Sequence, residues 1–215
     1  MKIIIKFPTR SRPDKFFETL RKYKDNLDDQ SILFIVSCDL DDATMNNDKI
    51  KEQIKYFENV KMYFNDNKSK VDAINANLEN VDFDILLLAS DDMIPQVQGF
   101  DTIIRDQMVK HFPDTDGVLR FFDGYNTDTN TLCILGKKYY DRFGYIYYPE
   151  YKSCWSDVEF TKVSQKLKKE AKINQIIIRH EHPDNGWGKY DDIYSLNKKN
   201  TIWDSTLYFK RLKYI

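Results

Sequence analysis

The stretch LLLASDDMIP, residues 86–95, joins an apolar run to two adjacent carboxylates. Four apolar residues precede Ser90, and Asp91 and Asp92 follow it directly. Hard divalent cations such as Mg²⁺ prefer oxygen ligands, so carboxylates at this place could hold one. A solvated acidic turn is the alternative, but the Met-Ile-Pro that follows is not typical of a loop. The pair therefore predicts a cation site at the end of a buried strand.

Polar side chains also follow the three earlier apolar runs, which are residues 2–7, 31–38 and 60–64. In open α/β sheets, ligands bind beyond the carboxyl ends of the strands. Arginine and lysine there could bind phosphate, and the carboxylates could bind ribose, base or metal. A nucleotide site is therefore expected at this edge. The residues after the three runs are Pro8, Thr9 and Arg10; Asp39, Asp41 and Asp42; and Asn65, Asp66, Asn67 and Lys68.

The loop after the first run lacks the glycines of the common phosphate-binding motifs. It reads FPTRSRP, which matches neither G-x-G-x-x-G nor G-x-x-x-x-G-K-[ST]. The sequence therefore argues against a dinucleotide-dependent dehydrogenase and a P-loop enzyme. A bound diphosphate would then need another counter-charge, which a cation held by carboxylates supplies.

Two later motifs, CWSDVEF at 154–160 and RHEHP at 179–183, carry further ionisable groups. Asp157 could act as a base, or it could only stabilise the start of a helix through the helix dipole. His180 and His182 are two of the three histidines, and their clustering favours a ligand or phosphate role over that of ordinary surface histidines. Two residues apart on a strand, they could share a face. Trp155 could stack on a sugar or simply pack.

The elements that must position these residues alternate along the first half of the chain. The apolar runs at 2–7, 31–38, 60–64 and 83–90 are continuous, which is typical of strands buried on both faces of a parallel sheet. Amphipathic helices between them give the order of a doubly wound sheet. Their apolar stripes are Phe16, Leu20, Tyr23 and Leu27; Ile50, Ile54 and Phe57; Val71, Ile74 and Leu78; and Phe100, Ile104 and Met108.

The second half is more mixed. Apolar runs at 117–122 and 131–136 predict two strands, and a helix is expected over 157–172 with Val163, Leu167 and Ala171 facing inward. A strand is expected over 173–180, and the polar, aromatic tail from Pro183 onward has no clear pattern. We expect one α/β domain over 1–215, with a mixed region after about residue 115.

Bulk composition narrows the class of partner. The 215 residues include 41% hydrophobic residues and carry a formal net charge of −1, so neither nucleic acid nor a membrane surface is an expected partner. Three cysteines without C-x-x-C spacing favour a reducing compartment. No run approaches the roughly 20 apolar residues of a membrane span, and MKIIIKFPTR lacks the apolar stretch of a signal peptide. We expect a soluble, cytoplasmic protein.

On these motifs the sequence resembles the GT-A fold glycosyltransferases of the nucleotide-diphospho-sugar transferase superfamily, in particular the family-2-like branch with its small viral and bacterial enzymes. FPTRSRP is similar to the loop that meets the nucleotide base, which implies roles for Pro8, Thr9, Arg10 and Arg12. VSCDLDD is similar to the segment that contacts base or ribose. That similarity implies Asp39 as the first choice and Asp41 as the second.

Two further stretches complete the donor side of the resemblance. NKSKVDAINANL is similar to the helix that covers the nucleotide, which implies Asn67, Lys70 and Asn75 as contacts. ASDDMIP resembles a degenerate Asp-x-Asp motif in which Ser90 takes the first Asp position and Asp92 the last. The resemblance makes Asp92 the metal ligand, with Asp91 supporting it.

The acceptor side and the metal site follow from the later motifs. CWSDVEF is similar to the acidic motif of the acceptor side, which makes Asp157 the general base, with Glu159 as runner-up and Trp155 beside them. RHEHP resembles the C-terminal histidine motif that completes the metal site. His182 is preferred because it lies further into the loop, with His180 as the alternative.

The resemblance implies a Mn²⁺- or Mg²⁺-dependent glycosyltransferase with a nucleotide-sugar-binding half at 1–115 and an acceptor-binding half with the C-terminal segment at 116–215. The donor would be a UDP- or GDP-sugar, the acceptor a hydroxyl of a carbohydrate or another molecule, and the transfer inverting. A sugar nucleotidyltransferase is one alternative, although FPTRSRP lacks the glycines of its usual loop. A non-catalytic carbohydrate-binding or structural protein on the same fold is another, favoured by Ser90 in place of the first Asp.

Overall fold

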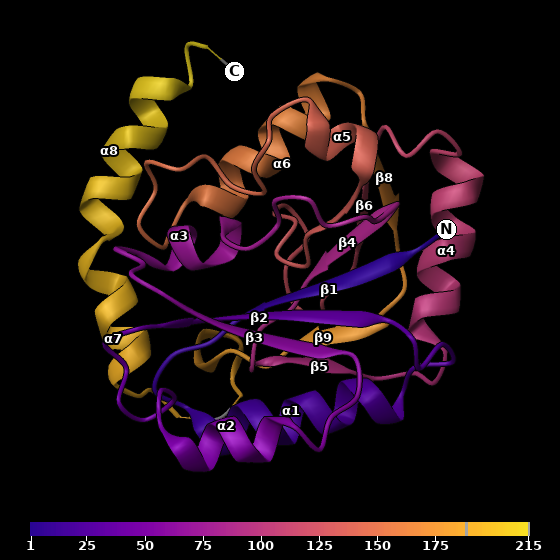
Figure 1. Ribbon diagram of the computed structural model, residues 1–215. Helices are drawn as coiled ribbons and strands as arrows, with labels where there is room; N and C mark the ends of the chain where they lie inside the picture. The colour runs from indigo at the N-terminus through magenta and orange to yellow at the C-terminus, as the bar shows by residue number, and fades with distance from the viewer. Residues whose placement is uncertain (188, 215) are drawn as a thin grey trace.

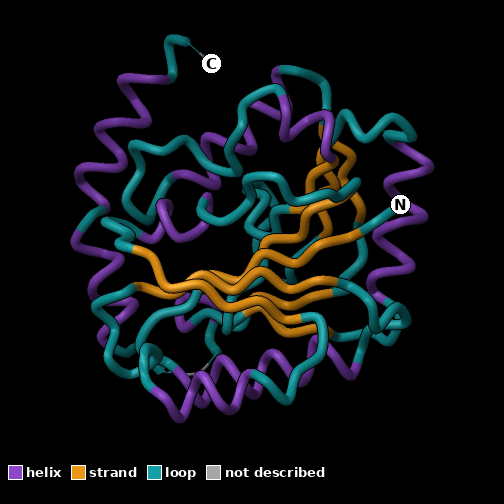
Figure 2. The backbone as a smooth tube through the Cα atoms, in the orientation of Figure 1, coloured by secondary structure: helices purple, strands orange, loops and turns teal. Residues whose placement is uncertain are grey.

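The computed structural model describes residues 1–187 and 189–214. A seven-stranded sheet in the order β3-β2-β1-β4-β7-β6-β8 forms the centre of the molecule, with helices on both faces (Figure 1). The backbone view shows the strands as one twisted layer between helical layers (Figure 2). This arrangement confirms the expected single-domain α/β fold with a mixed sheet.

Four parallel strands form the first half of a doubly wound sheet. They are β1 (Ile3–Pro8), β2 (Leu33–Asp39), β3 (Val60–Asn65) and β4 (Ile85–Leu88). The chain builds outward from β1 to β2 and β3 on one side, and then returns to add β4 on the other side. Such a reversal opens a crevice at the carboxyl ends of the two central strands. The ends of β1 and β4 therefore face one crevice.

Helices cover the two faces of this half. On one face lie α1 (Pro13–Asp25), α2 (Asp48–Ile54) and α4 (Phe100–His111), and on the other α3 (Lys70–Asn75) (Figure 1). Each face has its own apolar core, because side chains of a strand alternate between the two faces. Of the predicted stripes, Leu27, Phe57 and Leu78 fall just beyond the ends of their helices.

The second half extends the sheet with mixed polarity. β7 (Ile134–Gly136) pairs antiparallel with β4 and with β6 (Val118–Phe121), and β8 (Glu170–Ile173) pairs parallel with β6 at the edge. The short helix α5 (Lys137–Asp141) and the longer α6 (Ser156–Lys166) lie on the same face as α3 (Figure 1). The residues after β4 and before α6 thereby reach the same end of the molecule.

The helix expected over 157–172 is shorter than predicted. The helix α6 ends at Lys166, because Lys168 adopts a left-handed conformation with φ of 56°. The amides of Lys168 and Lys169 then bond back to the carbonyls of Gln165 and Ser164, which closes the last turn. Ala171 consequently lies in β8, and Leu167 is 40% exposed rather than inward.

The strand expected over 173–180 is reduced to β9 (Ile178–His180). This strand does not join the central sheet. It pairs antiparallel with β5 (Met93–Pro95), in a register that places His180 opposite Met93. The amide of Glu181 also donates to the Asp92 carbonyl at 2.7 Å. The small ribbon therefore ties the histidine segment to the aspartate pair.

The tail forms a short 3₁₀ turn (Pro183–Asn185) and the helices α7 (Asp192–Lys199) and α8 (Thr201–Arg211). The two helices run along the side of the molecule where the parallel strands end (Figure 1). Among the described residues, no helix is long and apolar enough to cross a membrane.

Candidate functional site

A cleft of about 720 Å³ lies at the carboxyl ends of the parallel strands. Its walls come from the loops after β1, β2, β3 and β4, the start of α6, the β9 segment and α7. Most of the residues predicted for the site line this one cleft. They are Pro8, Thr9, Arg10, Arg12, Asp39, Asp41, Asn67, Lys70, Ser90, Asp91, Asp92, Trp155, Asp157, His180 and His182.

Two predicted residues do not line the cleft. Asn75 accepts the amides of Ile146 and Tyr147 at 3.0 and 3.1 Å, so its side chain holds the loop between α5 and α6. Glu159 is buried and pairs with Arg211 at 2.9 Å while accepting the Tyr151 hydroxyl at 2.8 Å. Both side chains are committed to internal contacts that shape the second half of the fold.

One end of the cleft carries an ion-pair network that links β1 to β2. Arg10 pairs with Asp39 at 2.5 Å and with Asp41 at 2.7 Å. Asn67, after β3, donates to the other oxygen of Asp39 at 2.7 Å. Three neighbouring strand ends are thus joined through Asp39, whose carboxylate is fixed at the edge where a base or ribose would lie.

Arg12 connects the donor side of the cleft to α7. Its guanidinium pairs with Asp91 at 2.9 Å and with Asp191 at 2.6 Å, and lies 4.2 Å from the centre of the Tyr194 ring. Asp191 in turn caps α7 by accepting the amides of Ile193 and Tyr194. The side chains of Arg12 and Asp91 are 10% and 8% exposed, so this pair is a buried link between the loops after β1 and β4.

The two adjacent carboxylates have different electrostatic environments. Burial and repulsion from Asp92 raise the pKa of Asp91 above its ordinary value, with Arg12 opposing them. Burial also acts to raise the pKa of Asp92, but its interactions with His180 and Ser90 outweigh burial and bring the pKa below the ordinary range. The negative charge of the pair is therefore concentrated on Asp92.

Asp92 lies at the meeting point of three segments. Its Oδ1 accepts the Ser90 hydroxyl, and its Oδ2 accepts the Tyr194 hydroxyl at 3.1 Å. His180 Nε2 lies 3.7 Å from the same Oδ2. Ser90 thus supports the carboxylate directly although it stands where the family motif has an aspartate.

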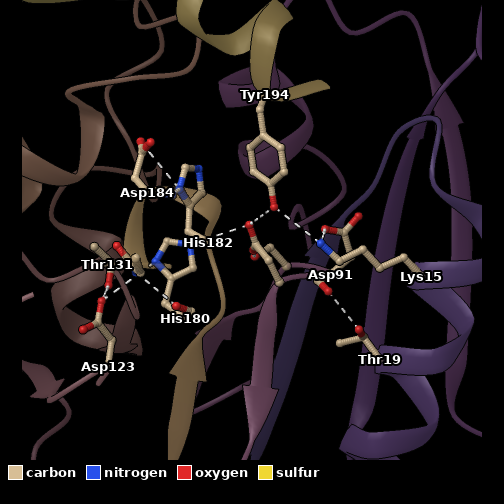
Figure 3. A network of polar contacts seen from close by, with 12 residues as sticks. Lys15, Thr19, Asp91, Asp123, Thr131, His180, His182, Asp184 and Tyr194 are labelled. Atoms are coloured by element: carbon tan, nitrogen blue, oxygen red, sulfur yellow. Dashed lines mark hydrogen bonds and ion pairs between the residues drawn. The ribbon is translucent and has the colours of Figure 1, made fainter. Parts of the chain in front are cut away.

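The two histidines differ in the nitrogen that they present. His182 Nδ1 accepts the amide of Asp184 at 3.1 Å, so a neutral His182 carries its proton on Nε2. Burial and the neighbouring His180 lower the pKa of His182, which favours the neutral ring. His182 therefore offers a hydrogen-bond donor, whereas His180 directs Nε2 toward Asp92. Figure 3 shows the His182 ring above the His180 ring, with the Tyr194 side chain to their right.

Asp157 enters the cleft from the first turn of α6. The helix begins after Trp155, which has a left-handed φ of 62°, and the Trp155 ring packs 5.3 Å from that of Tyr208 in α8. Asp157 is partly buried, and burial raises the pKa of its carboxyl above the ordinary value. A carboxylate with a raised pKa is a better proton acceptor than a solvated one.

Lys70 supplies positive charge to the cleft between Asp92 and Asp157. It is the first residue of α3, whose N-terminus is capped by Ser69 through a bond to the Asp72 amide. Lys70 acts to lower the pKa of both Asp92 and Asp157. A lysine in this place can stabilise the anionic oxygens of a diphosphate.

The side chains of the cleft supply only some of the ligands that a divalent cation needs. Among residues 1–187 and 189–214, no three His, Cys, Asp or Glu side chains converge as a ligand group. Asp92 and His180 do converge, and a separation of 3.7 Å is compatible with a cation at about 2.1 Å from each atom. Mg²⁺ sites of this kind are usually completed by substrate phosphates and water. The pair fits a cation that binds together with a diphosphate.

Several cleft residues have no signal in the sequence. Ile193, Tyr194, Leu196 and Asn197 of α7 line the cleft, although they belong to the tail in which no pattern was found. The position of α7 beside the cleft depends on contacts with distant parts of the chain, such as the hydrogen bond from Tyr194 to Asp92, which are 102 residues apart. A sequence motif cannot reveal such a contact.

No protein-family model matches the sequence, and no curated protein matches it significantly. Solved structures do match. The structure of S. aureus TarS 1–349 matches with a TM-score of 0.66 at 14% identity, over 86% of this chain and 62% of that chain. The same fragment in complex with UDP-GlcNAc matches with a TM-score of 0.65 at 16% identity, over 91% and 61%.

A mannosyltransferase from Pyrobaculum calidifontis, PcManGT in complex with GDP-Man and Mn²⁺, also matches. Its TM-score is 0.62 at 11% identity, over 81% of this chain and 55% of that chain. The chain thus spans less than two thirds of the length of each of these structures. At these identities, the likeness shows a shared fold.

Proposed function

The chain has the GT-A fold of these glycosyltransferase structures, and we propose that it transfers a sugar from a nucleoside diphosphate sugar to an acceptor hydroxyl. The observation that carries the proposal is the meeting of Asp92, Asp157 and His180 in one cleft. These residues come from three distant segments of the chain. Each has a type that diphosphate departure or hydroxyl activation requires.

The donor occupies the half of the cleft beneath the loops after β1, β2 and β4. Asp39 and Asp41, with Arg10 and Asn67, form the end that receives the base and ribose. The proposal covers both UDP-sugars and GDP-sugars as donors, since the structures of TarS and PcManGT contain UDP-GlcNAc and GDP-Man respectively. Arg12 holds Asp91 and thereby shapes the floor next to the phosphates.

The diphosphate lies near Lys70, His182 and Asp92. Lys70 supplies charge, and the Nε2 proton of His182 donates a hydrogen bond to a phosphate oxygen. Asp92 and His180 would hold Mn²⁺ or Mg²⁺, and the cation would stabilise the negative charge that grows on the departing diphosphate. The position of His180 Nε2 near Asp92 supports His180 as the metal ligand, and the bond to His182 Nδ1 supports His182 as the hydrogen-bond donor, the reverse of the preference drawn from the motif.

Asp157 acts as the general base. It takes the proton of the acceptor hydroxyl while the oxygen attacks the anomeric carbon, and the bond from that carbon to the diphosphate oxygen breaks. Attack opposite the leaving group inverts the anomeric configuration. Trp155 lines the same part of the cleft and forms one side of the acceptor site.

The proposal is tested by measuring release of UDP or GDP from a panel of UDP- and GDP-sugars with Mn²⁺. We expect one donor to be turned over, and turnover to stop when EDTA removes the metal. The variant Asp92→Asn should lose the metal-dependent activity. The matched control Asp82→Asn makes the same change on a side chain that is 90% exposed, and it should behave as wild type.

Two results would contradict the proposal. Equal turnover by wild type and Asp92→Asn would remove the assigned metal site. A folded wild-type protein that neither binds nor turns over any donor in the panel would instead favour a carbohydrate-binding role. Conversion of a labelled nucleoside triphosphate to a sugar nucleotide would identify a nucleotidyltransferase.

A further inference from the structure

The imidazole of His180 lies between two carboxylates. Its Nε2 is 3.7 Å from Asp92 Oδ2, and its Nδ1 is 3.8 Å from Asp123 Oδ2. Nδ1 is buried and has no hydrogen-bond partner among the described residues. Figure 3 shows Asp123 and Thr131 on the side of His180 away from Tyr194. The Asp123 carboxylate thus lies within 4 Å of Nδ1, on the side toward which this nitrogen can direct a proton.

Asp123 is held rigidly in the loop after β6. Its Oδ1 accepts the amides of Tyr125 and Asn126 at 2.8 and 2.6 Å, and its Oδ2 accepts the Thr131 hydroxyl. The residue is 2% exposed, and its carbonyl accepts the His180 amide at 2.9 Å. Backbone and side chain of Asp123 therefore both face the same histidine, 57 positions later in the chain.

We propose that Asp123 is a positioning residue that fixes His180 in the tautomer with its proton on Nδ1. The Nε2 lone pair is then directed at the cation that Asp92 shares. A histidine that ligates a metal commonly donates its other ring proton to a carboxylate, and loss of that partner typically weakens metal binding by about 10–100-fold. This inference rests on the proposed metal site but assigns a residue that does not line the cleft.

The first measurement uses the wild-type protein without metal. The chain has only three histidines, so ¹⁵N chemical shifts of their ring nitrogens can be assigned with single His→Gln variants. We expect the neutral His180 ring to carry its proton on Nδ1 and the neutral His182 ring on Nε2. Opposite tautomers in one protein would be a signature that a purely structural aspartate does not require.

The second measurement uses Asp123→Asn. The amide oxygen can keep the two backbone bonds of Oδ1, which places the NH₂ group at the Oδ2 position facing Nδ1. An NH₂ group at this position donates a hydrogen bond that Nδ1 of His180 must accept, so the ring proton moves to Nε2. We expect the tautomer to switch and the affinity for Mn²⁺, titrated with UDP or GDP present, to fall about 10–100-fold.

Asp128→Asn is the matched control, because it makes the same change on an exposed residue of the same loop. It should leave both the His180 tautomer and the Mn²⁺ affinity unchanged. A wild-type His180 protonated on Nε2, or an Asp123→Asn variant with wild-type Mn²⁺ affinity, would overturn the role of Asp123. A wild type that binds no Mn²⁺ at all would overturn the proposed metal site itself, and this inference with it.

Discussion

Asp91 and Asp92 are neighbours in sequence but have separate tasks in the structure. Asp91 faces Arg12 and links the β4 loop to the β1 loop, whereas Asp92 faces His180 and Tyr194 at the centre of the cleft. Two adjacent buried carboxylates disfavour double ionisation, and because the two face different partners, the charge is divided unequally between them. At the scale of single residues, the proposed chemistry depends on such partners as much as on the acidic residues themselves.

The assignment of Asp157 as general base predicts a large loss of turnover in Asp157→Asn. Loss of a positioned base typically costs about 10²–10⁴ in rate, while the donor site is not touched by the change. We therefore expect kcat to fall by that factor and donor KM to stay close to wild type. Steady-state kinetics measure both, and a variant with more than a tenth of wild-type kcat would argue for another base.

The raised pKa of Asp157 also predicts a pH dependence of stability without metal or donor. A carboxyl whose folded pKa exceeds its unfolded value favours the folded state when protonated. Its favourable contribution is therefore lost as pH rises from the unfolded value through the folded pKa. We expect Asp157→Asn to gain stability relative to wild type across this rise.

Urea unfolding of wild type and Asp157→Asn at several pH values measures this difference. Groups that do not interact with Asp157 contribute equally to the two unfolding free energies and cancel when these are subtracted. A difference that does not change with pH, or one that moves in favour of wild type as pH rises, would contradict the raised pKa.

At the scale of elements, α8 positions the loop that leads into α6. Asp204 of α8 is fully buried and accepts the amides of Lys152, Ser153 and Cys154 at 2.8, 2.9 and 2.8 Å. This loop leads directly into Trp155 and Asp157. One helix from the tail therefore fixes the entry to α6, although it contributes no proposed catalytic group.

Asp204→Ala should accordingly damage both stability and activity. It leaves three buried amides without their charged acceptor, and we expect the free energy of unfolding to fall by about 3 kcal/mol. Because the loop loses its anchor, we also expect kcat of the variant to fall by a larger factor than its affinity for the donor. Chemical denaturation and donor titration measure the two effects, and Asp106→Ala, at an exposed site on α4, serves as the control.

At the scale of the whole molecule, the cleft joins both halves of the chain. Its walls combine the strand ends of the first half with α6, β9 and α7 of the second. A ligand that fills it contacts segments from most of the sequence. A ligand that binds only the native state raises the free energy of unfolding in proportion to the logarithm of 1 + [ligand]/Kd.

We therefore expect a clear thermal shift with a nucleoside diphosphate and Mn²⁺ together. At 100 times Kd the stabilisation is about 2.7 kcal/mol, which for a domain of this size raises Tm by roughly 5–10 °C. Either component alone should give less, and Asp92→Asn should remove the gain from the metal. Identical shifts with and without Mn²⁺ would contradict a cation shared with the diphosphate.

Local patterns in the sequence were sufficient for the first half of the fold. Continuous apolar runs predicted β1 to β4, because strands buried on both faces are rich in apolar side chains. The strand β3 is the exception, since it lies at the edge of the sheet and exposes Lys61 and Tyr63. Polar residues at the ends of those strands then had to gather at one edge, because parallel strands share their carboxyl side. The doubly wound α/β fold and most of the cleft lining could thus be predicted from residue types and their order, whereas the GT-A assignment came from the resemblance of short motifs to a known family.

The tertiary structure decided which of these residues face one another. The register of β5 with β9 pairs residues more than 80 positions apart and brings His180, rather than His182, toward Asp92. Contacts of Tyr194, Asp123 and Asp204 also join residues 50 or more positions apart, and no periodicity encodes them. Burial leaves a local pattern because it acts on each residue separately. The partner of a buried polar group is set by how distant segments pack, and only the folded chain contains that information.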